Sequence, residues 1–131
     1  MNWDVIVHYL RDHQPKLLAI YGFGSRMTGD ANQQSDWDIG LLFDGKSDPV
    51  TLWNIAENLA ERLDNDVDLV DLRTASVVMQ YQIITTGKRL WTKNHHAALY
   101  ESFILSSKTE LDEDRALLLN RIQQEGTVHG R

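Results

Sequence analysis

The chain has 131 residues, a formal net charge of −6 and no cysteine, with 42% hydrophobic and 24% charged residues. These values suit one globular domain with a real core, and they exclude general disorder, disulfides, thiolate metal sites and cysteine nucleophiles. The acidic charge argues against broad attachment to phosphate backbones, so we expect no stable nucleic-acid binding and favour a protein or small-molecule substrate.

Membrane and export signals are not expected in this chain. No apolar run approaches the roughly 18 residues of a membrane span. The first residues lack a basic region followed by an apolar core. We therefore expect a cytoplasmic protein with no membrane partner.

Apolar spacing predicts helices and strands in alternation along the chain. In chain order the expected elements are a helix over 3–13, a strand over 16–23, a short helix over 25–29, a polar loop over 30–35, a strand over 36–43, a helix over 49–63, a strand over 65–72, a helix between Thr74 and Gly87, a strand over 88–92 and helical structure over 95–124. Several ends carry their own signals. Pro15 ends the first helix, Asp48 with Pro49 starts the helix over 49–63, and Thr74 is the expected N-cap of the next helix.

The helical pattern beyond residue 95 contains one polar stretch, Ser106 to Thr109, where we expect an interruption. Thr109 followed three residues later by Asp112 has the spacing of a new helix start. One long helix and two short helices are equally compatible with the pattern. Residues 126–131 are expected to form a frayed tail.

Two apolar runs carry the residues that point to chemistry. The run over 17–21 ends in the turn Gly22-Phe23-Gly24-Ser25, and ten residues later Asp36 and Asp38 lead into the next run. Glycine lets a backbone approach a triphosphate closely, and backbone N–H groups with the Ser25 hydroxyl can hold its oxygens. Asp36 and Asp38 alternate with apolar residues, so both carboxylates should face one side of the strand.

The paired aspartates indicate a site for hard cations. Mg²⁺ and Mn²⁺ prefer oxygen ligands, and phosphoryl-transfer sites commonly hold two ions about 4 Å apart. Such a pair needs a third carboxylate, and Asp68 is favoured by its central place on the acidic side of the strand over 65–72. Asp64, Asp66 and Asp71 compete for this role.

With these residues in view, the sequence resembles the minimal nucleotidyltransferases (MNT) of the polymerase beta superfamily, which are often paired with a HEPN-domain toxin. The resemblance covers about residues 16–91 and lies in Phe23-Gly24-Ser25-Arg26, Gly29, Ser35-Asp36-Trp37-Asp38-Ile39 and Val67-Asp68-Leu69-Val70. It implies an α/β (α+β) fold with a small mixed sheet of about four strands flanked by helices, and a C-terminal helical segment over about 95–125. Residues 1–131 would then form a single minimal nucleotidyltransferase domain.

The resemblance also implies an activity, which is transfer of AMP from ATP to a hydroxyl with two Mg²⁺ ions, or Mn²⁺, and release of pyrophosphate. In the toxin-paired branch the acceptor is a tyrosine of the partner RNase, so the protein would be an antitoxin that forms a complex with its toxin. Gly24 and Ser25 would hold the triphosphate, and Asp36 and Asp38 would bridge the metals. Asp68 would bind the catalytic metal and help deprotonate the hydroxyl. Arg26 would either touch the leaving phosphates or pair on the helix surface.

Two other functions remain compatible with the sequence. A nucleotidyltransferase could modify a small-molecule hydroxyl, such as that of an aminoglycoside, although little chain remains to enclose such an acceptor. A non-catalytic antitoxin could act by binding alone. The adjacent Leu117, Leu118 and Leu119 make the C-terminal segment apolar over more than one packing face, which favours a surface for a partner. Trp37 could stack on a base, but its place on the apolar side of its strand favours a core residue.

Overall fold

The computed structural model describes residues 2–29 and 35–128 of the chain. Its helices and strands, in chain order, are α1 (Asn2–His13), β1 (Leu17–Phe23), α2 (Ser25–Thr28), β2 (Trp37–Phe43), α3 (Pro49–Leu63), β3 (Val67–Asp71), the 3₁₀ turn η1 (Leu72–Thr74), α4 (Val77–Thr86), β4 (Lys88–Thr92) and α5 (His96–Val128). The order of elements confirms the order expected from the sequence. The polar loop expected over 30–35 lies almost entirely outside the described residues.

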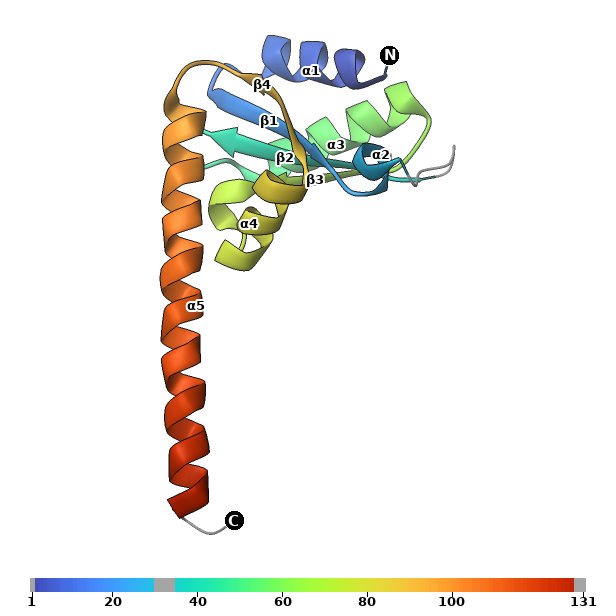
Figure 1. Cartoon of the computed structure of the whole chain (residues 1–131). Coiled ribbons are helices and arrows are strands. Elements are labelled where there is room, and N and C mark those ends of the chain that lie inside the picture. Colours follow the sequence, from blue (N-terminus) through green and yellow to red (C-terminus); the bar gives the residue numbers. More distant parts are fainter. Residues whose placement is uncertain (1, 30–34, 129–131) are drawn as a thin grey trace.

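Four strands form one mixed sheet in the order β3-β2-β1-β4 (Figure 1). β1 pairs antiparallel with both β2 and β4, whereas β2 and β3 run parallel. Parallel neighbours cannot be joined by a tight turn, and here α3 makes the crossover between them. The predicted small mixed sheet flanked by helices is therefore confirmed.

One face of the sheet is covered by α1 and α3, which pack their apolar sides on β1 and β2. The buried residues of this layer are Ile6, Leu10, Leu17, Ile20, Trp37, Ile39, Leu41, Phe43, Ile55 and Leu59. α3 starts as the sequence indicated, because the Asp48 carboxylate accepts a hydrogen bond from the Val50 backbone N–H at 3.1 Å and Pro49 occupies the first turn. Trp37 is 4% exposed, which confirms it as a core residue.

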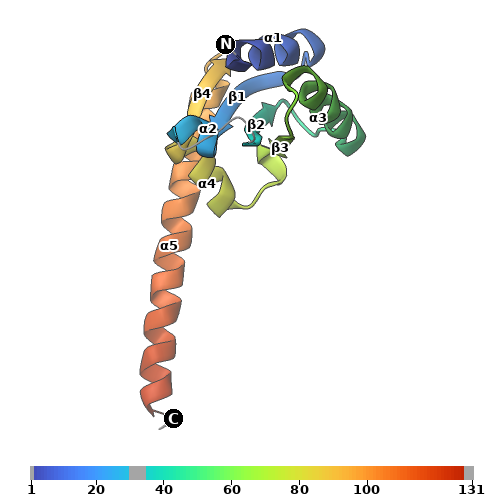
Figure 2. The ribbon, with the colours of Figure 1, turned by 90° about the vertical axis from the view of Figure 1, so that its right-hand side faces the viewer.

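The opposite face is covered by α4 and by the first turns of α5, as Figure 2 shows from the side. Its buried residues are Leu18, Ala19, Tyr21, Leu42, Leu72, Ile83 and Ala97. The Tyr21 hydroxyl donates to Glu101 at 2.7 Å, and Arg89 forms an ion pair with the same carboxylate at 3.0 Å. Burial, and next the bond to Glu101, raises the pKa of Tyr21, so this phenol keeps its proton and its role as donor. These contacts hold the first turns of α5, here called the root of α5 (residues 96–104), against the sheet.

α5 is one helix of 33 residues, and the interruption expected at Ser106 to Thr109 is wrong. The Thr109 hydroxyl donates to the Leu105 carbonyl at 3.0 Å inside the helix, and Lys108 pairs with Asp112 one turn on at 2.6 Å. Both polar side chains therefore support the helix instead of ending it. The helix also continues through residues 126–128, where a frayed tail was expected.

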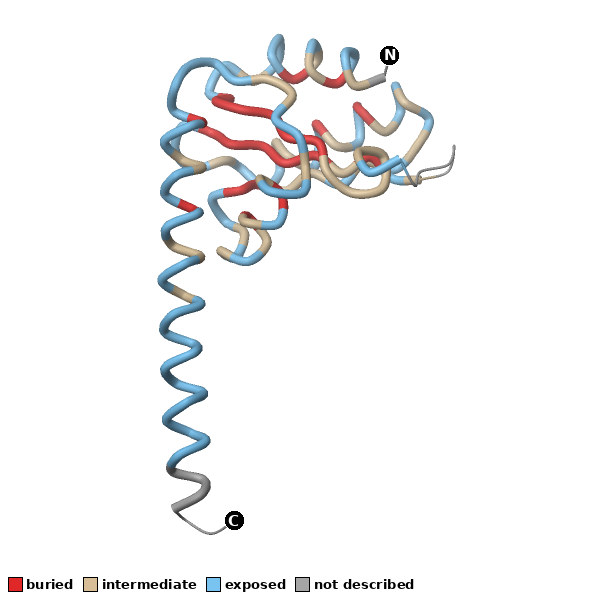
Figure 3. The backbone as a smooth tube through the Cα atoms, in the orientation of Figure 1, coloured by how far each residue is buried: buried red, intermediate tan, exposed pale blue. Residues whose placement is uncertain are grey.

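Most of α5 projects away from the rest of the molecule (Figures 1 and 3). Ile104 is its last buried residue, and every described side chain from 112 to 124 is exposed. At about 1.5 Å per residue, the part of α5 from residue 105 to Val128 extends about 36 Å. No helix in the described part of the chain combines the length and the apolar character that a bilayer crossing requires.

Two local predictions need correction, one at the start of β3 and one at the start of α4. The N-cap of α4 is Ser76, whose hydroxyl accepts from the Met79 backbone N–H at 3.1 Å, whereas Thr74 belongs to η1 and donates to the Asp71 carbonyl. β3 starts at Val67 and not at residue 65, because Asp64 ends α3 in the left-handed conformation, with φ of 53°. Two acceptable capping residues two positions apart cannot be ranked from residue type alone.

Candidate active site

The turn after β1 depends on Gly24. Its φ of 76° and ψ of −164° lie in a region that is essentially restricted to glycine. The Gly24 carbonyl accepts hydrogen bonds from the backbone N–H groups of Met27 and Thr28, at 3.0 and 3.2 Å. These bonds start α2 directly after the strand and place the half-buried Ser25 at its first position.

Gly24 also lies against the carboxylate of Asp38. A Cβ added to Gly24 would overlap Asp38 Oδ2 and would lie 2.9 Å from Asp38 Cγ. Only a residue without a side chain allows this approach. The structure therefore brings the turn and the second aspartate together.

Strand pairing places a third carboxylate beside this pair. In the parallel register of β2 and β3, Asp68 is the partner of Asp38, and in the antiparallel register of β1 and β2, Phe23 is its partner on the other side. Neighbouring strands lie about 4.8 Å apart, and partners in register face the same side of a sheet. Asp36 lies two residues before Asp38, just before β2 begins, and is close enough to repel its carboxylate.

The electrostatics of Asp38 reflect this crowding. Asp36 and Asp68 are exposed, whereas Asp38 is half-buried. Partial burial, and then repulsion from Asp68 and from Asp36, raises the pKa of the Asp38 carboxyl above its usual range. Three carboxylates that repel one another in this way form a region of negative potential, which cations relieve.

The other aspartates near β3 have different positions. Asp71 is buried, accepts from the Ser47 hydroxyl and from the Arg73 backbone N–H, and caps η1 at the opposite end of β3. Asp64 ends α3, and the backbone carbonyl of Asp66 accepts from the Trp37 N–H at 3.0 Å. Of the four candidates, Asp68 is the one in register with Asp38.

Arg26 is held beside the turn by the residues that lead into β2. Its Nε and Nη2 groups donate to the Ser35 carbonyl at 3.0 and 2.8 Å, and its Cζ lies 4.0 Å from the centroid of the Trp37 ring. Ser35 contributes through its backbone, so its side chain carried no signal by which the sequence could identify it. The sequence predicted Trp37 as a core residue, but it did not predict the contact of its ring with the Arg26 guanidinium.

The donor set fits hard divalent cations. Within residues 2–29 and 35–128, no group of three or more His, Asp or Glu side chains is arranged so that it could hold a metal ion without further ligands. Mg²⁺ is usually held by one or two carboxylates together with substrate phosphates, and not by a cage of protein ligands. An open edge with Asp36, Asp38 and Asp68 next to the Gly24 turn therefore has the oxygen chemistry that such ions require.

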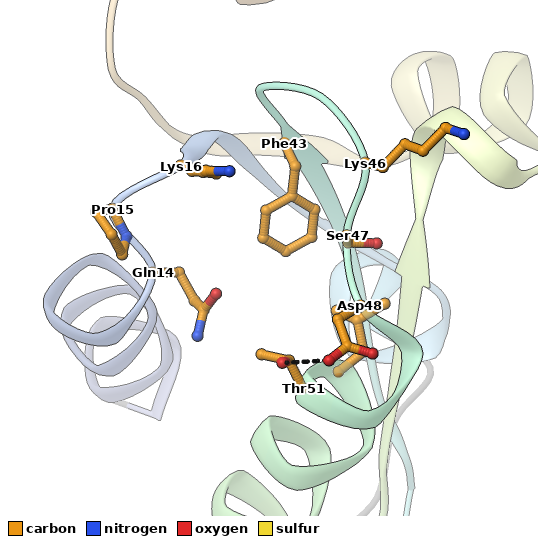
Figure 4. A pocket seen from close by; sticks show the side chains of 9 residues that line it. Gln14, Pro15, Lys16, Phe43, Lys46, Ser47, Asp48 and Thr51 are labelled. Atoms are coloured by element: carbon orange, nitrogen blue, oxygen red, sulfur yellow. Dashed lines mark hydrogen bonds between the residues drawn. The ribbon is translucent and has the colours of Figure 1, made fainter.

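A separate cavity of about 260 Å³ lies at the other ends of the same strands (Figure 4). Lys16 precedes β1 and Phe43 ends β2, whereas the turn and the aspartates lie where β1 ends and β2 begins. Figure 4 shows Asp48 bonded to Thr51 at its rim, at 3.3 Å, as part of the α3 cap. This cavity is therefore remote from the carboxylates.

Comparison with known proteins places this geometry among nucleotide-transferring enzymes. The family model described as polymerase beta, nucleotidyltransferase matches residues 4–96. The protein adenylyltransferase MntA of Shewanella oneidensis is 38% identical over 122 residues, which cover 93% of this chain and 88% of that protein. A crystal structure of a toxin–antitoxin with AMP-PNP is 38% identical with a TM-score of 0.82, over 94% of this chain and 99% of that chain. One chain of a structure described as tri-AMPylated S. oneidensis HEPN toxin in complex with MNT antitoxin is 37% identical to this chain, with a TM-score of 0.76, over 93% of this chain and 96% of that chain.

Proposed function

Since this chain belongs to the polymerase beta nucleotidyltransferase family, we propose that it is an antitoxin that transfers AMP from ATP to a HEPN-family RNase toxin and so neutralises it. The acceptor is a hydroxyl, preferentially that of a tyrosine. One observation carries the proposal, namely that the turn at Gly24 and the carboxylates of Asp38 and Asp68 come together at one end of the sheet. The similarity to a protein adenylyltransferase and to a structure of an AMPylated HEPN toxin with MNT antitoxin supports a toxin as the acceptor of AMP.

We assign the roles of the site residues from this arrangement. Gly24 and the Ser25 hydroxyl hold the triphosphate, and Asp36, Asp38 and Asp68 would hold two divalent ions, Mg²⁺ or Mn²⁺, which when bound would neutralise charge on the phosphates. Asp68 accepts the proton of the acceptor hydroxyl, whose oxygen forms the new bond to the α-phosphorus as the bond to pyrophosphate breaks. Positioning and electrostatics contribute most of the rate in such a transfer.

The projecting part of α5 is the proposed surface for the toxin. Leu117, Leu118 and Leu119 are 68%, 53% and 59% exposed, and Ile122 adds a fourth large apolar side chain. In proteins most of the stability of a helix comes from tertiary packing of its apolar face and not from intrinsic helix propensity. The alignment with the toxin–antitoxin structure covers 94% of this chain. The part left out is shorter than the segment of α5 beyond Ile104, so at least part of the projecting helix has a counterpart in that structure. A partner that packs along these leucines would explain both features.

The remaining expectations stay predictions of this proposal. Residues 1–131 act as a single minimal nucleotidyltransferase domain, with a core over about 16–91 and the helical segment as its partner arm. The protein works in the cytoplasm, where ATP and an RNase toxin are both present.

The test is transfer of AMP to a HEPN-family RNase toxin. Incubation of both proteins with ATP and Mg²⁺ should add the mass of AMP to the toxin and abolish its RNase activity. The double variant Asp36→Asn with Asp38→Asn should add none. Asp12→Asn with Asp44→Asn is the matched control, because it removes two exposed carboxylates away from the site and should modify the toxin normally.

Two outcomes would contradict the proposal. Equal modification by the Asp36 and Asp38 double variant would show that these carboxylates do not support transfer. Full protection from the toxin by that variant without nucleotide would show that binding alone neutralises the toxin.

A further inference from the structure

Arg26 connects two of the segments that carry the proposed ligands. It belongs to α2, next to Ser25, and its guanidinium donates twice to the carbonyl of Ser35, just before β2. The Cζ of the same guanidinium lies over the Trp37 ring, 4.0 Å from its centroid. One residue, Asp36, stands between these two contacts.

Trp37 gives the arginine a fixed surface. The indole is 4% exposed and meets Trp3 edge-on, with ring centroids 4.9 Å apart. The Trp37 backbone N–H donates to the Asp66 carbonyl at 3.0 Å, two residues before Asp68. The stack on Trp37 therefore links α2 to the start of β2 and, through that bond, to the start of β3.

We propose that Arg26 is a positioning residue that fixes Asp36 relative to the Gly24 turn, and not a ligand of the nucleotide phosphates. This inference rests on the proposed function. Asp36 is exposed and lies outside the paired part of β2, so the sheet alone does not hold it. Anchoring the carbonyl before it and the ring after it limits the backbone freedom of Asp36 and keeps its carboxylate on the side of Asp38.

The contact requires arginine specifically. A guanidinium presents several N–H groups in one plane and stacks on an aromatic face, whereas an ammonium is a strongly hydrated point charge on a flexible stem. Arg26→Lys keeps the positive charge but loses the paired donation and the planar stack. It therefore separates the two roles, because a phosphate ligand acts mainly through charge and a positioning residue acts through shape.

The test compares Arg26→Lys with the wild-type protein in three measurements. Binding of AMP-PNP with Mg²⁺, followed by calorimetry, should stay within about threefold. Hydrogen exchange of the backbone amides of residues 36–38 should become faster. The kcat for AMP transfer to the toxin should fall by about 10- to 100-fold, the usual loss when a group that orients a metal ligand is removed, with little change in KM for ATP.

Arg11→Lys is the matched control, since the Arg11 guanidinium also lies over a tryptophan, 5.4 Å from the Trp91 ring centroid, on a helix outside the site. It should leave all three measurements unchanged. Trp37→Phe should retain an aromatic surface and most of the kcat, whereas Trp37→Leu should reproduce the exchange and kcat effects of Arg26→Lys. These two variants keep the inference testable if Arg26→Lys does not fold.

The inference is overturned if Arg26→Lys weakens AMP-PNP binding tenfold or more while kcat and amide exchange stay unchanged, because Arg26 would then act on the phosphates. It is also overturned if neither exchange nor kcat responds. Failure of the proposed function looks different. In that case the wild-type protein itself transfers no AMP to the toxin, while analogue binding and amide exchange still report on Arg26.

Discussion

A methyl group added at Gly24 would occupy the space that the Asp38 carboxylate fills. Gly24→Ala therefore imposes two costs. The backbone conformation, with φ of 76° and ψ of −164°, costs a residue with a side chain about 1–3 kcal/mol. Moving the Asp38 side chain off its rotamer costs about 0.5–1.5 kcal/mol more.

These costs convert into a measurable change in thermal stability. For a chain of this length, about 1 kcal/mol lowers Tm by about 4 °C, so Gly24→Ala should lower Tm by roughly 6–18 °C by the same relation. AMP transfer, measured well below that Tm, should fall by about 100-fold, because a shift of about 1 Å in a reacting group has effects of that size.

Two comparisons isolate the contact with Asp38 from the backbone cost. Gly29→Ala is the matched control, because Gly29 also has a positive φ, 87°, but no atom of the residues that the structure describes lies within 4 Å of an added Cβ. It should lose stability without a comparable loss of transfer. In an Asp38→Ala background, Gly24→Ala should cost less than in the wild-type protein, since the colliding carboxylate is gone. An equal cost in both backgrounds, or nearly normal transfer by Gly24→Ala, would refute the reasoning.

Three further predictions concern the carboxylates and α5. Because burial and its acidic neighbours raise the pKa of Asp38 in the folded protein, its ionised form lowers stability as pH rises through that pKa. Asp38→Asn should therefore raise the Tm of the metal-free protein at pH 7, and the difference should vanish below about pH 3.9, the usual pKa of the group; an equal difference at both pH values contradicts this. Asp68→Asn should lower kcat at least 100-fold while Asp66→Asn stays within a few-fold, as rates of AMP transfer will show, because only Asp68 is in register with Asp38. Leu117→Ser with Leu118→Ser should weaken toxin binding about tenfold or more in calorimetry, whereas Val50→Ser, equally exposed on α3, should not.

Local chemistry explains what the sequence could predict about this fold. The cap formed by Asp48 and Pro49 involves neighbouring residues, so residue types were sufficient to start α3 correctly. The strand over 88–92 agrees with β4 to the residue because a glycine ends α4 just before it. Alternation placed Asp36 and Asp38 on one side of a strand. It could not show that β2 and β3 run parallel, which is what sets Asp68 beside Asp38.

The errors occurred where one side chain has two local options. Thr109 was expected to cap a new helix, but its hydroxyl bonds to the carbonyl four residues earlier, and sequence does not distinguish the two bonds. The sequence predicted that Arg26 contacts either the leaving phosphates or another residue on the helix surface. In the structure Arg26 contacts the Ser35 carbonyl and the Trp37 ring, which lie just before and at the start of the next strand. Such contacts depend on tertiary structure, and spacing along the chain carries no record of them.

The carboxylates and α5 lie on the same face of the sheet, whereas α1 and α3 cover the other face. Asp38 and Gly40 point to the same side of β2, and a Cβ on Gly40 would meet Ile83 of α4 at 3.2 Å. The carboxylates therefore lie on the face that α4 and the root of α5 cover, and that face becomes apolar beyond them. Because Tyr21 and Arg89 fix Glu101 at that root, α5 leaves the domain in a set direction. A toxin bound along α5 would then lie on the same side of the sheet as Asp38 and Asp68, whereas a toxin bound on α1 or α3 would be separated from them by the sheet.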